Sequence, residues 1–143
     1  MGKANQPGKG LPKETILVVD DDESVRRALL WTLNVDYRVL EAASRLEANT
    51  LLQHEKIDVV VSDLHLPPHV EDISEGLAII EAARDRDPPA QVVVITGTDS
   101  KHAGLEAVKR GAYGFFEKPL DADEVLHIVN QAARMRRQRN GHA

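Results

Sequence analysis

The chain has 143 residues, 42% of them hydrophobic, with a formal net charge of −5 and no cysteine. This length matches one domain and argues against a multidomain enzyme, while the lack of cysteine excludes disulfides, zinc–thiolate sites and thiol catalysis. The acidic balance argues against direct nucleic-acid binding, and no run approaches the roughly 18 apolar residues of a membrane span or forms a secretion signal, so we expect a cytoplasmic protein.

Residues 1–13 are rich in Gly, Pro and Lys, so we expect a flexible leader there. From that point, short runs rich in Val and Ile alternate with longer amphipathic stretches, which is typical of an α/β domain with a parallel sheet covered by helices. We predict five strands, over residues 15–20, 37–42, 57–63, 91–97 and 113–118. The second strand alternates apolar and polar residues, which favours a sheet edge, whereas the first, third and fourth are continuously apolar and should be buried on both faces.

Polar residues mark the predicted helix starts between these strands. Asp22 and Asp99 are expected to cap helices near 23–34 and 100–110, and Ser44 with Glu47 and Asp121 with Glu124 have the spacing of capping boxes. A helix starting near Glu75 should end before Pro88 and Pro89. Trp31, on the first helix, is expected to pack in the core or at its margin.

The last predicted helix runs into an arginine-rich end. We place the domain at residues 14–135 and interpret residues 136–143 as a basic C-terminal extension or linker. The positive charge there also fits a simpler explanation, because it complements the dipole at the end of a helix.

Polar side chains follow four of the predicted strands. Because ligands of open parallel sheets bind outside the carboxyl ends of the strands, these side chains should converge at one edge. They are Asp20, Asp21 and Asp22 after the first strand, Asp63 after the third, Thr96 after the fourth and Lys118 after the fifth. Taken singly, each has an ordinary structural explanation, and we interpret Asp22 mainly as a helix cap.

Clustered carboxylates repel one another unless a cation lies among them. A site of oxygen ligands alone favours a hard divalent ion, and Mg²⁺ commonly combines one or two carboxylates with phosphate oxygens. Lysine and threonine side chains can bind phosphoryl oxygens, and a carboxylate can act as the nucleophile to form an aspartyl phosphate. The sequence therefore predicts a Mg²⁺-dependent phosphoryl site.

The strings ILVVDDDES, VVVSDLHLP, VVVITGT and GAYGFFEKP, in this order, resemble the receiver domain of two-component response regulators. The resemblance covers about residues 14–135. It implies a flavodoxin-like, doubly wound sheet of order 2-1-3-4-5, an order for which receiver proteins are among the known examples. It also implies a phosphorylation-controlled signalling domain, not an enzyme, that assists its own phosphorylation and dephosphorylation.

The resemblance assigns a role to each residue that matches a family motif. Asp63 would accept the phosphoryl group from a sensor histidine kinase, and Asp20, Asp21, Asp63 and the backbone carbonyl of His65 would hold Mg²⁺. Lys118 would assist the transfer, and the Lys118–Pro119 bond would be cis. Thr96 and Phe115 would be switch residues that move on phosphorylation and change the surface of the fourth helix, fifth strand and fifth helix.

The C-terminal part is similar to receivers of sigma-54-type activators, which precede ATPase and DNA-binding parts. We therefore expect an output domain or partner protein outside this chain, control of transcription, and homodimerisation. The chain is interpreted either as a part of such a regulator or as a single-domain receiver.

Three features depart from the family pattern. Eight residues, Pro68 to Glu75, separate Pro67 from Gly76 where receivers commonly have about three, and the resulting loop is either a tolerated insertion or a partner contact. His65 occupies a position that affects the lifetime of the phosphate in the family. Phe115 lacks the hydroxyl of the tyrosine often found there.

Two other classes of function remain open at this point. A haloacid-dehalogenase-like phosphatase would use Asp20 as its nucleophile with Mg²⁺, but the chain is short for that family and the scheme leaves Asp63 without a purpose. A phosphorylation-independent binding module would keep only the fold. No role is assigned to His54, His69, His102, His127 or His142.

Overall fold

The computed structural model describes residues 13–97 and 100–141. Five strands alternate with five helices along this part of the chain. In order they are β1 (Thr15–Val19), α1 (Glu23–Leu33), β2 (Arg38–Ala42), α2 (Arg45–His54), β3 (Val59–Asp63), α3 (Ser74–Asp85), β4 (Gln91–Thr96), α4 (Lys101–Lys109), β5 (Gly114–Glu117) and α5 (Ala122–Gly141).

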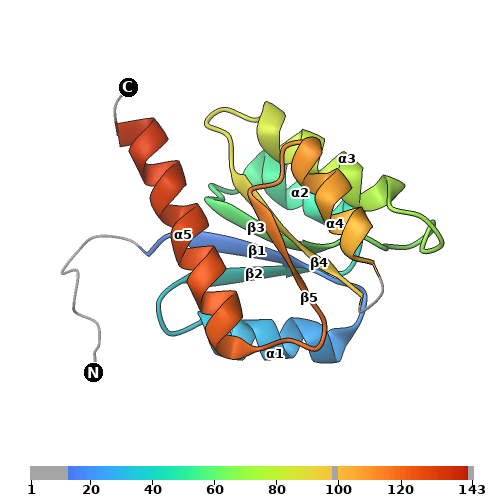
Figure 1. Ribbon diagram of the computed structural model, residues 1–143. Coiled ribbons are helices and arrows are strands. Elements are labelled where there is room, and N and C mark those ends of the chain that lie inside the picture. The colour runs from blue at the N-terminus through green and yellow to red at the C-terminus, as the bar shows by residue number, and fades with distance from the viewer. Residues whose placement is uncertain (1–12, 98–99, 142–143) are drawn as a thin grey trace.

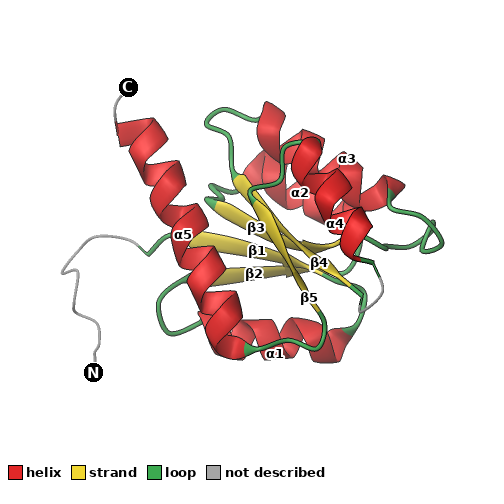
Figure 2. Cartoon of the chain, viewed as in Figure 1, coloured by secondary structure: helices red, strands yellow, loops and turns green. Residues whose placement is uncertain are grey.

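The strands form one parallel sheet of order β2-β1-β3-β4-β5, which confirms the predicted order. Helices α1 and α5 cover one face of the sheet and α2, α3 and α4 cover the other (Figures 1 and 2). Strand β2 lies at an edge, as its alternating sequence predicts, and its Arg38 and Glu41 are exposed. The chain therefore has the three-layer architecture expected of a doubly wound fold.

The central strands are continuously apolar because successive side chains enter different cores. Ile16 and Val18 of β1 pack with Leu29 and Leu33 of α1 and with α5, whereas Leu17 and Val19 pack on the side of α2 and α3. These four side chains of β1 are fully buried. Two-sided burial of this kind is the physical reason for the Val- and Ile-rich runs.

Several predicted helix caps are present. Asp22 accepts a hydrogen bond from the Ser24 N–H. Ser44 accepts one from the Glu47 N–H, and the Glu47 side chain accepts one from the Ala43 N–H. Asp121 accepts from the N–H groups of residues 123 and 124. Asp99 lies outside the described residues, and Ser100 occupies the N-cap position of α4.

The prediction for Trp31 is wrong. Its relative exposure is 79%, and neighbouring Val35 is 76% exposed. Leu29 and Leu33 occupy the core-facing side of α1, so the helical period directs Trp31 away from the sheet.

Helix α5 continues to Gly141, beyond the predicted end of the domain at residue 135. Arg136 is only 7% exposed, and its side chain forms an ion pair of 2.8 Å with Asp58. The boundary itself stays a prediction, as does the flexible leader, of which only Lys13 is described. Within the described part of the chain, no helix combines the length and apolar character needed to cross a membrane.

Candidate metal centre

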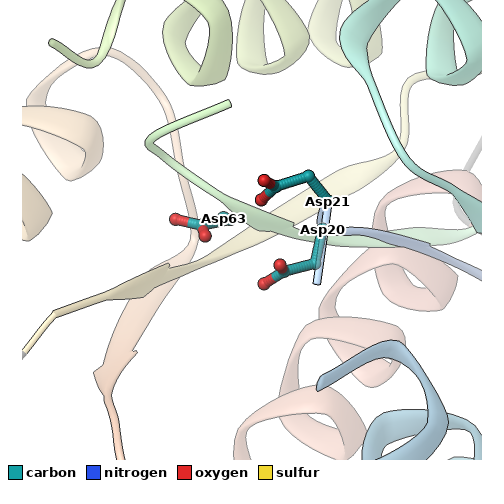
Figure 3. Close-up of side chains that lie close together, drawn as sticks. All are labelled: Asp20, Asp21 and Asp63. Carbon is teal, nitrogen blue, oxygen red and sulfur yellow. The ribbon is translucent and has the colours of Figure 1, made fainter. Parts of the chain in front are cut away.

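Three carboxylates meet at the carboxyl edge of the sheet. Asp20 and Asp21 directly follow β1, and Asp63 is the last residue of β3. The parallel register pairs Val19 with Ser62, so the ends of the two strands lie side by side. One carboxylate oxygen from each residue lies within 4.8 Å of the others, and Figure 3 shows the three side chains close together. The predicted convergence of these residues is confirmed in geometry.

Asp20 is the most deeply buried member of the group. Its exposure is 0%, and its Oδ1 accepts a hydrogen bond of 2.9 Å from the Asp22 N–H. Burial raises the pKa of Asp20 to about 6; the Asp22 N–H and Lys118 lower it, and the charges of Asp63 and Asp21 raise it. Its Oδ2 has no hydrogen-bond partner among the described residues. A buried carboxylate oxygen without a donor is an arrangement that a divalent cation would satisfy.

Asp63 is 7% exposed and is held by two neighbours. Its Oδ1 accepts a hydrogen bond of 3.0 Å from the His65 N–H, and the Lys118 Nζ lies 3.5 Å from its Oδ2. The same Nζ lies 4.0 Å from Asp20 Oδ2. Lys118 therefore places one positive charge between two carboxylates, and the bond that follows it, Lys118–Pro119, is cis as predicted.

Thr96 and Phe115 lie on the adjacent strands. Thr96 ends β4 with 0% exposure, and its hydroxyl donates a hydrogen bond of 3.4 Å to the Phe116 carbonyl. Phe115 is half-buried on β5, with its ring against Gly104 of α4, where an added Cβ would come within 2.5 Å of the ring. The hydroxyl of Thr96 therefore engages β5 rather than the three carboxylates.

The long loop after β3 is tied to the body of the domain by histidines. His65 Nδ1 lies 3.0 Å from the Val70 carbonyl, so this imidazole contacts the loop. His69 Nδ1 lies 3.0 Å from Glu75 Oε2, and Glu75 also binds Arg45 of α2 at 2.8 Å. His69 thus has a partner that sequence spacing did not reveal, because Glu75 lies six positions away across an irregular loop.

Arg26 is a second residue near the site that the sequence analysis missed. Its Nη1 donates a hydrogen bond of 2.7 Å to the backbone carbonyl of Asp20, and its Nε pairs with Glu41 of β2 at 3.2 Å. The side chain thereby fixes the turn that carries Asp20 and Asp21. The only available signal was an arginine one helical turn after the acidic residues, which is too common to be informative.

The residues present fit a hard divalent cation. Three carboxylates supply oxygen ligands, and one oxygen is buried without a donor. The lysine beside Asp63 can bind an anionic group that approaches the same place. The arrangement can therefore hold a metal ion and a phosphoryl group next to a carboxylate nucleophile.

Comparison with known proteins shows that the chain is similar in sequence to a family of signalling domains. Residues 16–130 match the family model of the response regulator receiver domain. The chain is 31% identical over 129 residues to the response regulator protein PilR of Pseudomonas aeruginosa, covering 88% of this chain and 27% of PilR. It is 33% identical over 125 residues to the C4-dicarboxylate transport transcriptional regulatory protein DctD of the same species, covering 85% of this chain and 26% of DctD.

Solved structures have the same fold. A response regulator receiver domain protein from Clostridium thermocellum superposes with a TM-score of 0.76 at 26% identity, covering 87% of this chain and 98% of that one. The chain thus spans about a quarter of the length of PilR and DctD but nearly all of an isolated domain.

Proposed function

Because this chain belongs to the response regulator receiver domain family, whose members are signalling domains of two-component systems, we propose that Asp63 accepts a phosphoryl group from a sensor histidine kinase. The observation that carries the proposal is the position of Asp63 within 4.8 Å of two further carboxylates and 3.5 Å from the Lys118 ammonium. This combination supplies a nucleophile, a metal-ligand set and a cation for the transferred group.

In the proposed reaction, a carboxylate oxygen of Asp63 attacks the phosphorus atom of the kinase phosphohistidine. An O–P bond forms, the N–P bond breaks, and the leaving imidazole takes up a proton. Asp20, Asp21, Asp63 and the His65 backbone carbonyl would hold Mg²⁺, which when bound offsets the negative charge of the phosphoryl oxygens. The Lys118 ammonium, already beside Asp63, contributes a charge-assisted contact to the same oxygens.

Thr96 and Phe115 are proposed to transmit the change. The Thr96 hydroxyl has a long hydrogen bond of 3.4 Å to the Phe116 carbonyl. A phosphoryl group of about −1.5 to −2 charges offers that hydroxyl a stronger acceptor. Movement of Thr96 would free space beside β5 for Phe115, whose ring now lies against α4. The altered surface of α4, β5 and α5 would control a downstream output, for which transcription is our proposal given the relative DctD.

We also propose that the domain forms homodimers and acts on an output domain or partner protein outside this chain. The named relatives are about four times as long as the matched region, which leaves room for such a domain in them.

The phosphorylation proposal can be tested by intact mass. Wild type, Asp63→Asn and Asp20→Asn are each incubated separately with Mg²⁺ and acetyl phosphate. We expect one phosphoryl group on wild type, and no labelling of wild type when a chelator is present. Asp63→Asn should not be labelled, because the amide is not a nucleophile of this kind. Asp20→Asn should label more slowly.

Other results would support the competing functions. Label that persists in Asp63→Asn and disappears in Asp20→Asn would favour the phosphatase that uses Asp20 as nucleophile. No label with acetyl phosphate or with a kinase donor would favour a binding module that keeps only the fold.

A further inference from the structure

A second polar site lies at the opposite edge of the sheet. A cavity of about 540 Å³ opens at the amino ends of β1 and β3, beside the C-terminal half of α5. Its lining includes four basic side chains: Lys13, Arg38, Lys56 and Arg136. The acidic cluster follows the other ends of the same strands, so the two sites are separated by the length of the sheet (Figure 1).

Arg136 forms the buried wall of this cavity. The residue is 7% exposed, and its Nη1 binds Asp58 Oδ1 at 2.8 Å. Two other nitrogens of the guanidinium, Nε and Nη2, have no hydrogen-bond partner among the described residues. The other oxygen of Asp58, Oδ2, accepts a hydrogen bond of 2.8 Å from the Thr15 N–H. Buried guanidinium donors without an acceptor are costly, so this wall favours an additional anion.

The carboxylates around the cavity are already paired with arginines. The pairs are Glu14 with Arg137, Glu55 with Arg38 and Asp58 with Arg136. The Lys13 ammonium donates a hydrogen bond of 3.3 Å to the uncharged Val35 carbonyl, and neither Lys13 nor Lys56 forms an ion pair with a residue that the structure describes. Within the lining itself, basic groups outnumber acidic groups four to two. The cavity therefore has positive charge that the protein does not neutralise.

Arg86, at the C-cap of α3, does not line the cavity but adds a positive charge near Arg136. Its Nη1 and Nη2 donate to the backbone carbonyls of Ile57 and Glu55, at 2.6 and 2.7 Å, and these acceptors carry no net charge. Burial, and next the positive charge of Arg136, lower the pKa of Arg86. Two guanidinium groups thus lie close enough to repel, and Asp58 is the carboxylate that acts on both.

We propose that this cavity binds the phosphate group of a small phosphate monoester or of free phosphate. A phosphate carries about −1.5 to −2 charges near neutral pH, which matches the two unpaired lysines. The guanidinium of Arg136 lines the cavity and can add a charge-assisted hydrogen bond to a phosphate oxygen. The volume lies in the range of about 300–1,000 Å³ of small-molecule sites, so it also has room for a group attached to the phosphate.

The proposal is independent of phosphorylation at Asp63. It concerns a different edge of the sheet and noncovalent binding, so its test omits Mg²⁺ and includes a chelator. Without a cation, the three carboxylates of the acidic cluster disfavour phosphate at that edge of the sheet. If phosphate does not bind this cavity, the proposed phosphorylation of Asp63 is unaffected. If Asp63 is not phosphorylated, the proposed phosphate binding is likewise unaffected.

The test is an NMR titration of the amide signals with inorganic phosphate and, separately, adenosine monophosphate. Ionic strength is held constant, and acetate serves as the control anion. We expect saturable shifts at Thr15 and Asp58, with a Kd of about 1 mM or tighter for phosphate. Tighter binding of the nucleotide would identify a phosphate monoester as the ligand class, and equal binding would identify the phosphate group alone.

Charge-matched variants separate the site from general attraction. Lys56→Gln should weaken phosphate binding about two- to fivefold, whereas Lys109→Gln, which removes an exposed lysine on α4, should have no effect. Arg136→Gln should abolish binding, and Arg136→Lys should restore only part of it because lysine lacks the planar fork. Lys56→Gln keeps the test valid if the Arg136 variants fold poorly. Absence of saturable shifts, equal binding of acetate, or an equal loss in Lys109→Gln would overturn the proposal.

Discussion

Asp20 carries the largest electrostatic cost in the site. Its pKa of about 6 means that the folded chain holds this proton more tightly than the unfolded chain, for which the ordinary value is near 4. The contribution of Asp20 to the free energy of unfolding is therefore fully present below about pH 4 and is lost as the pH rises through about 6. At neutral pH, without a metal ion, the ionised side chain opposes folding.

Because the ionised Asp20 side chain opposes folding at neutral pH, we predict that Asp20→Asn stabilises the protein. In chelator at pH 7.5, we expect the free energy of unfolding to rise by about 2 kcal/mol, with a smaller gain at pH 4.5. Urea denaturation at the two pH values measures it. Asp22→Asn is the control, because asparagine caps a helix nearly as well as aspartate. Mg²⁺ should raise the Tm of wild type more than that of Asp20→Asn; loss of stability in Asp20→Asn at pH 7.5 would contradict this electrostatic argument.

The contact between α4 and β5 depends on a glycine. Gly104 lies inside α4, where alanine would ordinarily be favoured by about 1 kcal/mol. A Cβ at this position would come within 2.5 Å of the Phe115 ring, so the two elements approach as closely as they do because the side chain is absent. The position of Phe115, which we propose to be a switch residue, is therefore linked directly to the packing of α4.

Gly104→Ala is expected to destabilise the domain by about 1–3 kcal/mol, because the clash outweighs the gain in helix propensity. In Phe115→Ala the same change should stabilise by roughly 0.5–1 kcal/mol, since the ring is gone. A double-mutant cycle by chemical denaturation measures this coupling between the two residues. Equal effects of Gly104→Ala in both backgrounds would show that the ring is not what limits this position.

At the scale of the whole molecule, the end of α5 is fastened to the amino edge of the sheet. Arg136 pairs with buried Asp58, and Arg137 pairs with Glu14. These contacts join residues far apart in sequence, and both arginines lie beyond the predicted domain boundary at residue 135. The direction in which α5 leaves the sheet is therefore fixed by buried charge as well as by its apolar face.

A chain that ends at residue 135 should consequently be less stable than one that ends at residue 138. We expect a loss of about 3 kcal/mol, because removing Arg136 leaves Asp58 as a buried carboxylate without its cation. Midpoints of urea denaturation measure the difference. The control is Arg137→Gln in the longer chain, which breaks a more exposed pair and should cost less than about 1 kcal/mol. Equal stability of the two chains would instead support a domain boundary at residue 135.

Much of the fold was predictable because it depends on local patterns. Apolar runs, and for β2 the alternation of apolar and polar residues, identified the strands that the structure describes. The spacing of short polar residues located the caps at Asp22 and Ser44. The convergence of Asp20, Asp21 and Asp63 followed from strand ends and a parallel sheet alone. Asp99 falls outside the described residues, so its predicted cap remains untested.

The sequence by itself determined the order of elements and the edge where the acidic residues collect, since periodicity and chain direction decide both. Only the tertiary structure decided the partners of Arg26, His69 and Arg136, and the exposure of Trp31. Spacing along the chain specifies which face of an element a side chain occupies. The neighbour that it meets there depends on how separate elements pack, and this packing also creates the basic cavity at the far edge of the sheet.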